Sequence, residues 1–334
     1  MNHNILFIRL RLLGDIIFTI PSIRLYNKHF PQSSIYYVVE EAFKEVTELL
    51  PGIQRRIVVP RKMGIRDLYR FRKEVRSIGF DTVIDFHCGP KAALLTYLSG
   101  AKTRIGYRTP NRNWAYNRLT PRMTGSGPDH SVYNQARLLE HLGIDSQEMP
   151  PYPEIKISPD RVSPEIRQWP EQHRQPKIVV HVGAGNTFRD WGLDNFGSLI
   201  QKLTRQGCAV ALIGSSAAEQ HKAASLTRDY PVRNFTGRLS IKEVLYLIGQ
   251  GDVYFGVDSG PLHLASLTAT PIVAIYGPNI PRISGPWRQR DVKILQLDME
   301  CRPCSQRECI YDTIRCMKNI TAEDAYENII RYIQ

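Results

Sequence analysis

The chain has 334 residues, of which 42% are hydrophobic and 23% charged, a composition that excludes a disordered, collagen-like or coiled-coil protein. Its 44 lysines and arginines exceed its 32 aspartates and glutamates, giving a net charge of +12, so nucleic acid, an anionic membrane surface and phosphorylated substrates are all compatible partners. A chain of this length exceeds one domain of ordinary size and predicts two.

The first 150 residues alternate β-rich runs with helical periodicity. Strands are expected over 5–9, 35–39, 57–59 and 82–86, and helices over 15–29, 40–50, 67–77 and 131–142. Continuous apolar strands separated by helices are typical of a parallel sheet covered on both faces. We therefore expect a doubly wound α/β domain over residues 1–150.

Seven prolines from Pro150 to Pro176 predict an irregular linker over 151–176. The alternation then resumes in a second α/β domain over 177–320. Its expected strands are 177–182, 208–213, 253–256 and 272–275, and its expected helices are 193–205, 217–229 and 241–248. Ligands of such sheets bind at the carboxyl ends of the strands, so two facing units would define a cleft between them.

A last segment, 321–334, is expected to be a carboxy-terminal helix over 322–332 that packs back on the amino-terminal domain. Thr321 is suited to be its N-cap, with Asp324 at the third helical position. No segment reaches the ~18 consecutive apolar residues of a membrane span. The amino-terminal stretch also lacks the order of a signal peptide, so we expect a cytoplasmic protein that can work at a membrane surface without entering it.

The strongest chemical signal is the stretch 253–266, in which a buried strand ends at Asp258-Ser259-Gly260 and a helix begins. Free N–H groups and the dipole at a helix start form an anion site, and Gly260 lets the backbone approach a ligand. His263 is close enough to the helix start to face the same ligand. A structural alternative is that Asp258 or Ser259 caps the helix and His263 packs in the core.

Together with 270–278, this stretch resembles the signature of glycosyltransferase family 9, the heptosyltransferases. The similarity runs over nearly the whole chain and implies a GT-B fold of two Rossmann-like domains facing a central cleft. It also implies an inverting, metal-independent enzyme that moves a heptose from ADP-heptose to the inner core of lipopolysaccharide. The resemblance assigns Asp258, Ser259, Gly260 and His263 to the donor diphosphate, with His263 as a catalytic residue that stabilises the leaving group. Leu262 is a further predicted donor contact.

A second match lies at 13–21, where Gly14 and Asp15 fit the family's Gly-Asp-x5-Pro motif. Gly14 permits a tight turn after the first strand and lies next to the acceptor in the resemblance. Asp15 is at a helix start and could serve only as a cap. The resemblance makes Asp15 the general base that deprotonates the acceptor hydroxyl, since inverting transfer requires one base and a stabilised leaving group.

A third match opens the second domain at 181–191, where a small-residue loop follows a strand. Thr187 is a predicted donor contact. The family usually has a lysine two positions before Trp191, and this chain has Arg189 there. Arg189 would neutralise the departing phosphates with bidentate geometry, or it would pair with Asp190 or solvent.

The strand–loop–helix at 213–219 matches the place where a family glutamate binds the nucleotide ribose. Glu219 would then hold two ribose hydroxyls, or it is an ordinary first-turn acid favoured by the helix dipole. A weaker match at 234–240 corresponds to the family's turn near the adenine.

Four cysteines, Cys301, Cys304, Cys309 and Cys316, follow the spacing C-x2-C-x4-C-x6-C. The spacing permits a structural Zn²⁺ site of four thiolates. Reduced, packed thiols and disulfides are the other interpretations, and disulfides are unexpected in the cytoplasm. The catalytic scheme implied by the resemblance requires neither a metal nor a cofactor, and the ADP-sugar is its donor substrate.

The charge excess lies mainly in the first half, where two runs, 54–76 and 86–128, hold nine and seven basic residues. A solvated face is one interpretation. We assign the runs to an anionic glycolipid acceptor at the surface of the inner membrane. The candidate contacts are Arg61, Lys62, Arg104, Arg108 and Arg112.

Three other functions are compatible with parts of this sequence. The first is a transferase of the same fold that uses another nucleotide sugar or a non-lipopolysaccharide acceptor, and the second is a non-catalytic sugar-nucleotide-binding protein. The third, nucleic-acid binding, is disfavoured because the sequence has no zinc-finger spacing, RNA-binding aromatic motif or basic heptad pattern.

Overall fold

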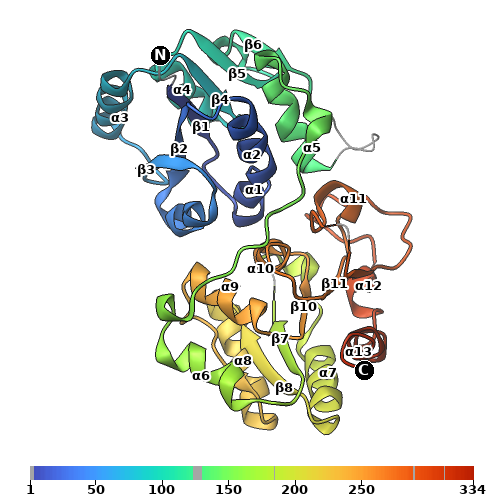
Figure 1. Cartoon of the computed structure of the whole chain (residues 1–334). Coiled ribbons are helices and arrows are strands. Elements are labelled where there is room, and N and C mark those ends of the chain that lie inside the picture. The colour runs from blue at the N-terminus through green and yellow to red at the C-terminus, as the bar shows by residue number, and fades with distance from the viewer. Residues whose placement is uncertain (1–3, 123–129, 184, 289, 312) are drawn as a thin grey trace. The chain divides into compact units, whose positions relative to one another are not determined.

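The computed structural model describes residues 4–122, 130–183, 185–288, 290–311 and 313–334. The chain forms two compact units, Met1–Tyr152 and Pro153–Gln334. Each unit is an α/β structure built around one parallel sheet (Figure 1).

The sheet of the amino-terminal unit has the strand order β3-β2-β1-β4-β5-β6. Its strands are β1 (Asn4–Ile8), β2 (Ser34–Glu40), β3 (Ile53–Val59), β4 (Thr82–Asp85), β5 (Thr103–Tyr107) and β6 (Arg118–Thr120). The chain moves outward from β1 to β3 and then returns to the other side of β1 with β4. The point where the order reverses therefore lies between β1 and β4, and ligands bind at such points in doubly wound sheets.

Helices cover both faces of this sheet. They are α1 (Leu13–Ile17), α2 (Ile20–His29), α3 (Ile65–Ile78), α4 (Pro90–Leu98) and α5 (Ser131–Ala136), with 3₁₀ segments at Glu41–Leu49, Asn113–Ala115, Arg137–Leu142 and Ser146–Glu148. Helix α2 contacts α5, and α3 contacts α4. On the α3 side, Leu6 and Ile8 of β1 pack with Phe71 and Val75 in one buried cluster.

The expected helix over 15–29 is divided into α1 and α2, because Pro21 in the first turn of α2 fits a new helix start rather than a helix interior. The segment expected as a helix over 40–50 is 3₁₀ instead. Helix α4 and strand β5 were not predicted. Since α4 is apolar around most of its circumference, it lacks the periodic pattern that marks an amphipathic helix.

The carboxy-terminal unit repeats the same topology in the order β12-β11-β10-β7-β8-β9. Its strands are β7 (Lys177–His181), β8 (Ala209–Ile213), β9 (Arg233–Asn234), β10 (Val253–Val257), β11 (Ile272–Ile275) and β12 (Val292–Leu295). The reversal of strand order falls between β7 and β10. The strongest sequence motifs of the chain lie at the carboxyl ends of these two strands.

The helices of this unit are α6 (Pro164–Gln172), α7 (Leu193–Arg205), α8 (Ala217–Asp229), α9 (Ile241–Gly249), α10 (Gly260–Ala265), α11 (Pro281–Ser284), α12 (Arg315–Lys318) and α13 (Ala322–Ile330), with 3₁₀ turns at Pro159–Arg161 and Thr187–Arg189. Helix α6 corrects the prediction of an irregular linker over 151–176. Pro164 occupies its first turn, where no backbone N–H is required, and Ile166 and Trp169 are buried.

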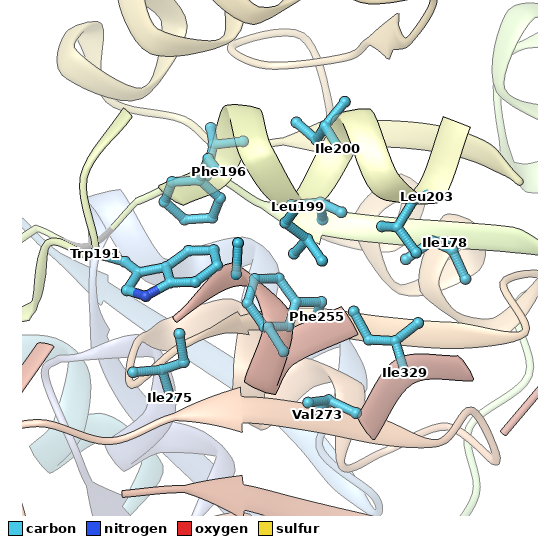
Figure 2. Packing of buried hydrophobic residues seen from close by; sticks show 14 of the residues in the cluster. Ile178, Trp191, Phe196, Leu199, Ile200, Leu203, Phe255, Val273, Ile275 and Ile329 are labelled. Atoms are coloured by element: carbon cyan, nitrogen blue, oxygen red, sulfur yellow. The ribbon is translucent and has the colours of Figure 1, made fainter. Parts of the chain in front are cut away.

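The core of the carboxy-terminal unit surrounds Trp191, as Figure 2 shows. The indole ring meets Phe196 and Phe255 edge-on, with ring centroids 5.0 Å and 5.3 Å away. Its Nε1 donates a 2.7 Å hydrogen bond to the carbonyl of Ile320 and so attaches the end of the chain to this core.

Helix α13 belongs to this same core, because Ile329 is buried in the cluster around Trp191 and α13 contacts α7. The expectation that this helix also packs back on the amino-terminal domain stays a prediction. Its predicted start is confirmed: Thr321 accepts a hydrogen bond from the Asp324 amide, and the Asp324 carboxylate accepts one from the Thr321 amide. None of the helices in the described residues is long and apolar enough to cross a membrane.

Candidate active site

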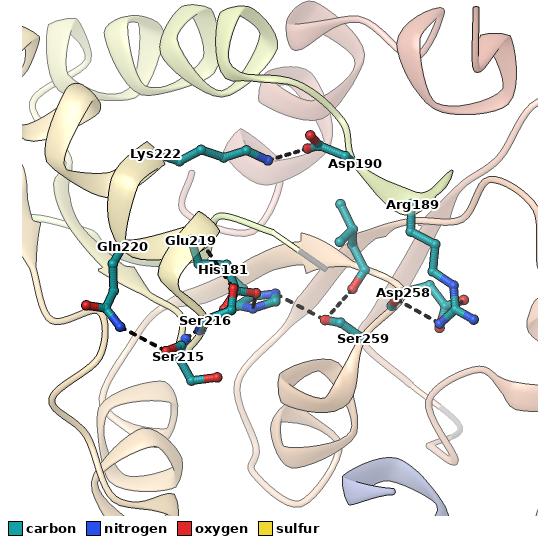
Figure 3. A network of polar contacts seen from close by, with 11 residues as sticks. His181, Arg189, Asp190, Ser215, Ser216, Glu219, Gln220, Lys222, Asp258 and Ser259 are labelled. Carbon is teal, nitrogen blue, oxygen red and sulfur yellow. Dashed lines mark hydrogen bonds and ion pairs between the residues drawn. The ribbon is translucent and has the colours of Figure 1, made fainter. Parts of the chain in front are cut away.

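A polar network occupies the carboxyl ends of β7 and β10, with His181 at its centre (Figure 3). His181 is the last residue of β7 and is 2% exposed. Its Nε2 lies 3.0 Å from Oε1 of Glu219, and its Nδ1 lies 3.1 Å from the hydroxyl oxygen of Ser259. His181 thus joins two predicted donor residues, although it was not itself predicted as a site residue.

Glu219 is buried and uses both carboxylate oxygens within the protein. While Oε1 contacts His181, Oε2 accepts hydrogen bonds from the amides of Ser215 and Ser216 at 2.7 Å and 2.8 Å. Burial alone would raise the pKa of Glu219, but His181 and the two amides outweigh burial and lower this pKa to about 2. Glu219 thus makes the contacts of a first-turn acid, and its contact with the ribose stays a prediction.

Two glycines are required by the position of Glu219. A Cβ atom on Gly183 would lie 2.6 Å from Cγ of Glu219, and a Cβ atom on Gly214 would lie 2.8 Å from its Cβ. The small residues after β7 and β8 therefore let this carboxylate enter the space between the two strand ends.

A second cluster surrounds Asp258, which follows β10 and is 4% exposed. Its Oδ2 accepts a 2.6 Å hydrogen bond from Asn279 and lies 3.5 Å from Nη1 of Arg189. Gln306 closes the ring: its Oε1 accepts from Nε of Arg189 at 2.9 Å, and its Nε2 donates to Asn279 at 2.7 Å. Burial raises the pKa of Asp258 even though Arg189 and Asn279 act in the opposite direction.

This cluster fixes the Arg189 side chain but engages only part of its guanidinium group. Nε and Nη1 contact Gln306 and Asp258, whereas Nη2 makes no hydrogen bond to the described residues, and the side chain is 26% exposed. Asp190 pairs instead with Lys222 at 2.5 Å, so the alternative pairing of Arg189 with Asp190 does not occur. Thr187 is exposed in the same 3₁₀ turn as Arg189.

The helix start predicted to bind phosphate is α10, with Ser259 as N-cap and Gly260 as first residue. The Ser259 hydroxyl does not cap the helix, because it donates to the Val257 carbonyl and contacts His181. Leu262 is completely buried and its amide donates to the Ser259 carbonyl, so its position does not support the predicted donor contact. His263 is 6% exposed.

In the amino-terminal unit, Asp15 lies in the first turn of α1 beside Arg9, which follows β1. Nη2 of Arg9 is 2.5 Å from Oδ2 of Asp15, and Nη1 donates to the Phe86 carbonyl at 2.6 Å. Oδ2 also accepts from the Leu12 amide at 3.4 Å and so caps α1. Oδ1 accepts no hydrogen bond from the described residues, and the side chain is 36% exposed. One oxygen is therefore fixed and the other is open.

The end of β4 and the turn after it add Asp85 and His87, neither of which was predicted as a site residue. Asp85 is fully buried and accepts hydrogen bonds from the amides of His87 and Cys88 and from the hydroxyl of Tyr116. Burial, with Arg9 nearby, lowers the pKa of His87 to about 4, so this imidazole is neutral at pH 7. Polar residues directly after a buried strand next to β1 were the signal that could have identified this turn.

Four of the five predicted acceptor contacts follow strands at the carboxyl edge of the amino-terminal sheet. Arg61 and Lys62 follow β3 and are exposed, and Arg108 follows β5. Nε of Arg112 donates to the Cys88 carbonyl, beyond the end of β4. Gly14 is buried in the first turn of α1.

Arg104 differs from the other four. It lies at the start of β5, and in a parallel sheet strand starts lie at the opposite edge from Asp15. Its guanidinium donates to the carbonyls of Ala101 and Ala115, both at 2.9 Å, and lies over the ring of Tyr97. This position contradicts the predicted acceptor contact at Arg104.

The predicted cysteine cluster lines one cavity of about 130 Å³. The lining thiols are those of Cys301, Cys304, Cys309 and Cys316, and all six cysteines of the chain are free. No three ligating side chains in the described part of the chain are grouped closely enough to hold a metal ion. The thiols are unpaired in this structure, and the choice among a structural metal site, reduced thiols and disulfides stays a prediction.

A family model described as glycosyltransferase family 9 (heptosyltransferase) matches residues 68–315, which is most of the sequence. The chain belongs to glycosyltransferase family 9. It is 25% identical to lipopolysaccharide heptosyltransferase 1 of Pseudomonas aeruginosa over 321 residues, which cover 92% of this chain and 87% of that protein.

Two solved structures resemble this family 9 chain over its full length. Escherichia coli ADP-heptose lipopolysaccharide heptosyltransferase II matches with a TM-score of 0.79 and 20% identity, covering 100% of this chain and 98% of that one. E. coli heptosyltransferase WaaC with ADP matches with a TM-score of 0.75 and 18% identity, covering 98% and 99%. The predicted GT-B class, with two Rossmann-like parallel-sheet units, is confirmed.

Proposed function

We propose that this family 9 glycosyltransferase moves a heptose from ADP-heptose to a lipopolysaccharide inner-core acceptor with inversion at the anomeric carbon. Its relatives are lipopolysaccharide heptosyltransferases, and WaaC has been solved with ADP and with ADP-2-deoxy-2-fluoro heptose. The observation that carries the proposal is the side chain of Asp15, whose two oxygens have different surroundings.

Asp15 is suited to act as the general base. Arg9 holds Oδ2 and keeps the carboxylate oriented, while Oδ1 is open to accept a proton. In the proposed step the acceptor oxygen attacks the anomeric carbon, the bond between that carbon and the β-phosphate oxygen breaks, and the hydroxyl proton passes to Asp15. Since ADP leaves as the new bond forms on the opposite face, no covalent sugar intermediate is required.

The leaving diphosphate would bind in the carboxy-terminal unit. Arg189 offers a free guanidinium nitrogen there, and the start of α10 offers the backbone of Ser259 and Gly260. Donors placed where negative charge develops lower the barrier to departure. Because Arg189 supplies a fixed positive charge, we propose that turnover is independent of divalent cations. Thr187 is placed to contact the same donor.

The acceptor would bind the amino-terminal unit at the carboxyl edge of its sheet. Arg61, Lys62, Arg108 and Arg112 lie along this edge on both sides of β1. Guanidinium and ammonium groups bind phosphate well, so a phosphorylated glycolipid fits this edge. We place the enzyme at the cytoplasmic face of the inner membrane, where such an acceptor is anchored.

The test is product analysis with purified protein, ADP-heptose and a set of truncated lipid acceptors. We expect ADP release and a product heavier by one heptose, with equal rates in EDTA and in Mg²⁺. Asp15→Ala should lose about 10²–10⁴-fold in kcat because the base contributes about that factor. It should still bind ADP, since Asp15 lies in the other unit from the donor residues.

Asp15→Asn is the matched control for size, because its amide oxygen can still cap α1 while the basicity and the negative charge beside Arg9 are removed. It should be as inactive as Asp15→Ala. Full turnover by either variant would contradict the proposed base, and turnover only with donors that release UDP or GDP would exclude ADP-heptose as the donor.

A further inference from the structure

Helix α3 exposes large apolar side chains to solvent on the amino-terminal unit. Ile65 is 87% exposed and Tyr69 is 64% exposed, and a spacing of four residues puts both on one face of the helix. The opposite face, with Phe71 and Val75, is buried in the core. An aliphatic side chain this exposed has no role in holding the helix to its own sheet.

The same face is strongly basic. At about 3.6 residues per turn, Arg72, Lys73 and Arg76 fall on the side of Ile65 and Tyr69. We call these five residues, Ile65, Tyr69, Arg72, Lys73 and Arg76, the α3 face. Arg66 and Arg70 flank it and are exposed.

The acidic residues of α3 do not cancel this charge. Asp67 caps the helix by accepting from the Gly64 amide at 2.9 Å, and Glu74 pairs with Arg55 at 2.5 Å. Within the described residues, the side chains of Arg72 and Lys73 form no ion pair or hydrogen bond. These charges are therefore available to an external anion.

A second exposed apolar pair adjoins the carboxyl end of α3. Tyr97 and Trp114 are 52% and 55% exposed, and their rings meet edge-on at 5.5 Å. Arg76 of the α3 face donates to the carbonyl of Leu98, the residue after Tyr97. Tyrosine and tryptophan beside basic side chains are typical of surfaces that rest in the headgroup region of a bilayer.

We propose that the α3 face docks on an anionic lipid bilayer, with Ile65 and Tyr69 entering the interface and the basic side chains meeting the lipid phosphates. A nucleic acid would engage the charges but would leave the aliphatic Ile65 without a partner, whereas a bilayer accommodates both. The inference rests on the proposed function, because an acceptor anchored in a membrane gives the enzyme a reason to bind one.

The position of α3 in the amino-terminal unit is consistent with docking on a bilayer. The helix begins after β3, just beyond Arg61 and Lys62, so Ile65 lies at the sheet edge where the acceptor is proposed to bind. Figure 1 shows α3 at the outer flank of the amino-terminal unit, on the side of β3. A bilayer held against α3 would bring a glycolipid headgroup to the carboxyl edge of the same sheet.

The test is co-sedimentation of the full chain with vesicles of phosphatidylcholine alone or with added phosphatidylglycerol, at low and physiological salt. Each basic residue near an anionic surface strengthens binding about fivefold. Arg66→Gln/Arg72→Gln/Lys73→Gln should therefore bind anionic vesicles about 100-fold more weakly and lose most of the salt dependence. Ile65→Ser/Tyr69→Ser should also weaken binding by about tenfold, at both salt concentrations.

Matched controls lie on the carboxy-terminal unit. Arg174→Gln/Arg331→Gln removes exposed charges, and Leu193→Ser removes a 40% exposed apolar side chain, so both should bind vesicles like the wild type. Equal binding by the wild type and the α3 variants, or sedimentation of the wild type with RNA but not with anionic vesicles, would overturn the proposal.

Turnover with a soluble acceptor that lacks acyl chains separates the two proposals. The α3 variants should keep wild-type rates with this acceptor and lose rate only with acceptor embedded in vesicles. If no variant and no wild-type protein transfers heptose, the proposed function fails while the vesicle result still decides the docking surface. If transfer is normal and vesicle binding is absent, the docking surface alone is refuted.

Discussion

Two arginines, one in each unit, make similar contacts to an aspartate and a backbone carbonyl but differ in their exposure to solvent. Arg9 donates to a backbone carbonyl and holds the carboxylate of Asp15, and it is itself 6% exposed. Arg189 contacts both the carbonyl and the carboxylate of Asp258 and keeps a quarter of its side chain exposed. The buried arginine can only orient its partner, whereas the partly exposed one can also meet a ligand.

We expect Gln306 to hold the Arg189 guanidinium in this position. Gln306→Ala removes the acceptor of the Arg189 Nε–H bond and the donor to Asn279. A hydrogen bond to a charged group is worth about 1.5–3 kcal/mol, so we expect the donor KM and the Kd for ADP to rise roughly tenfold or more. Calorimetry with ADP and initial rates over a range of ADP-heptose measure both.

Gln306→Glu should have a smaller effect than Gln306→Ala, because a carboxylate still accepts from Arg189. Gln201→Ala, an exposed glutamine on α7, is the matched control and should change neither constant. A wild-type donor KM in Gln306→Ala would show that Arg189 does not depend on this support.

Glu219 makes stability depend on pH. Its pKa is about 2 in the folded protein against 4.5 for the free side chain, so its stabilisation is present above about pH 4.5 and is lost as the pH falls toward 2. Glu219→Gln should lower the free energy of unfolding of the carboxy-terminal unit by about 2–3 kcal/mol at pH 7. Urea unfolding at about pH 7 and pH 3 measures this difference, which should shrink at the lower pH.

Glu327→Gln is the control for that experiment, because Glu327 is exposed on α13 and should show no such change. An equal loss of stability at both pH values would mean that Glu219 acts by packing and not by its charge.

At the scale of elements, the strands beside the reversal of strand order in each sheet could be predicted from sequence. The residues that contact the polar motifs at the ends of these strands could not. β1, β7 and β10 are continuous apolar runs followed by Gly14-Asp15, the 181–191 loop and Asp258-Ser259, so both the strands and the motifs could be placed from sequence. Asp15 and Arg189 were predicted as site residues because the motifs around them resemble those of the family. Their roles in catalysis stay predictions.

The partners could not be predicted because they come from distant segments. Gln306 reaches Asn186 across 120 positions in the sequence, and no local pattern indicates that the cysteine-rich loop meets the turn after β7. Arg104 shows the converse error. A basic run looks uniform in sequence, but the sheet places the start and the end of β5 at opposite edges, and only the end lies near Asp15.

At the scale of the whole molecule, the net charge of +12 has two separate uses on the amino-terminal unit. One group of basic residues lies along the carboxyl edge of the sheet, and the other lies on α3. The structure therefore divides a charge excess that looks continuous in sequence into an acceptor edge and a docking surface, which respond differently to mutation.

Neutralising the acceptor edge tests this division. Arg61→Gln/Lys62→Gln/Arg108→Gln should raise the KM for a phosphorylated soluble acceptor and weaken its dependence on salt, because exposed charges act through screened attraction. The KM for ADP-heptose should stay at the wild-type value, since the donor residues are in the other unit. The α3 triple variant is the control of equal charge and should leave both constants unchanged with the soluble acceptor. If the donor KM rises as much as the acceptor KM, the charge serves the nucleotide and the assignment of the amino-terminal unit to the acceptor is wrong.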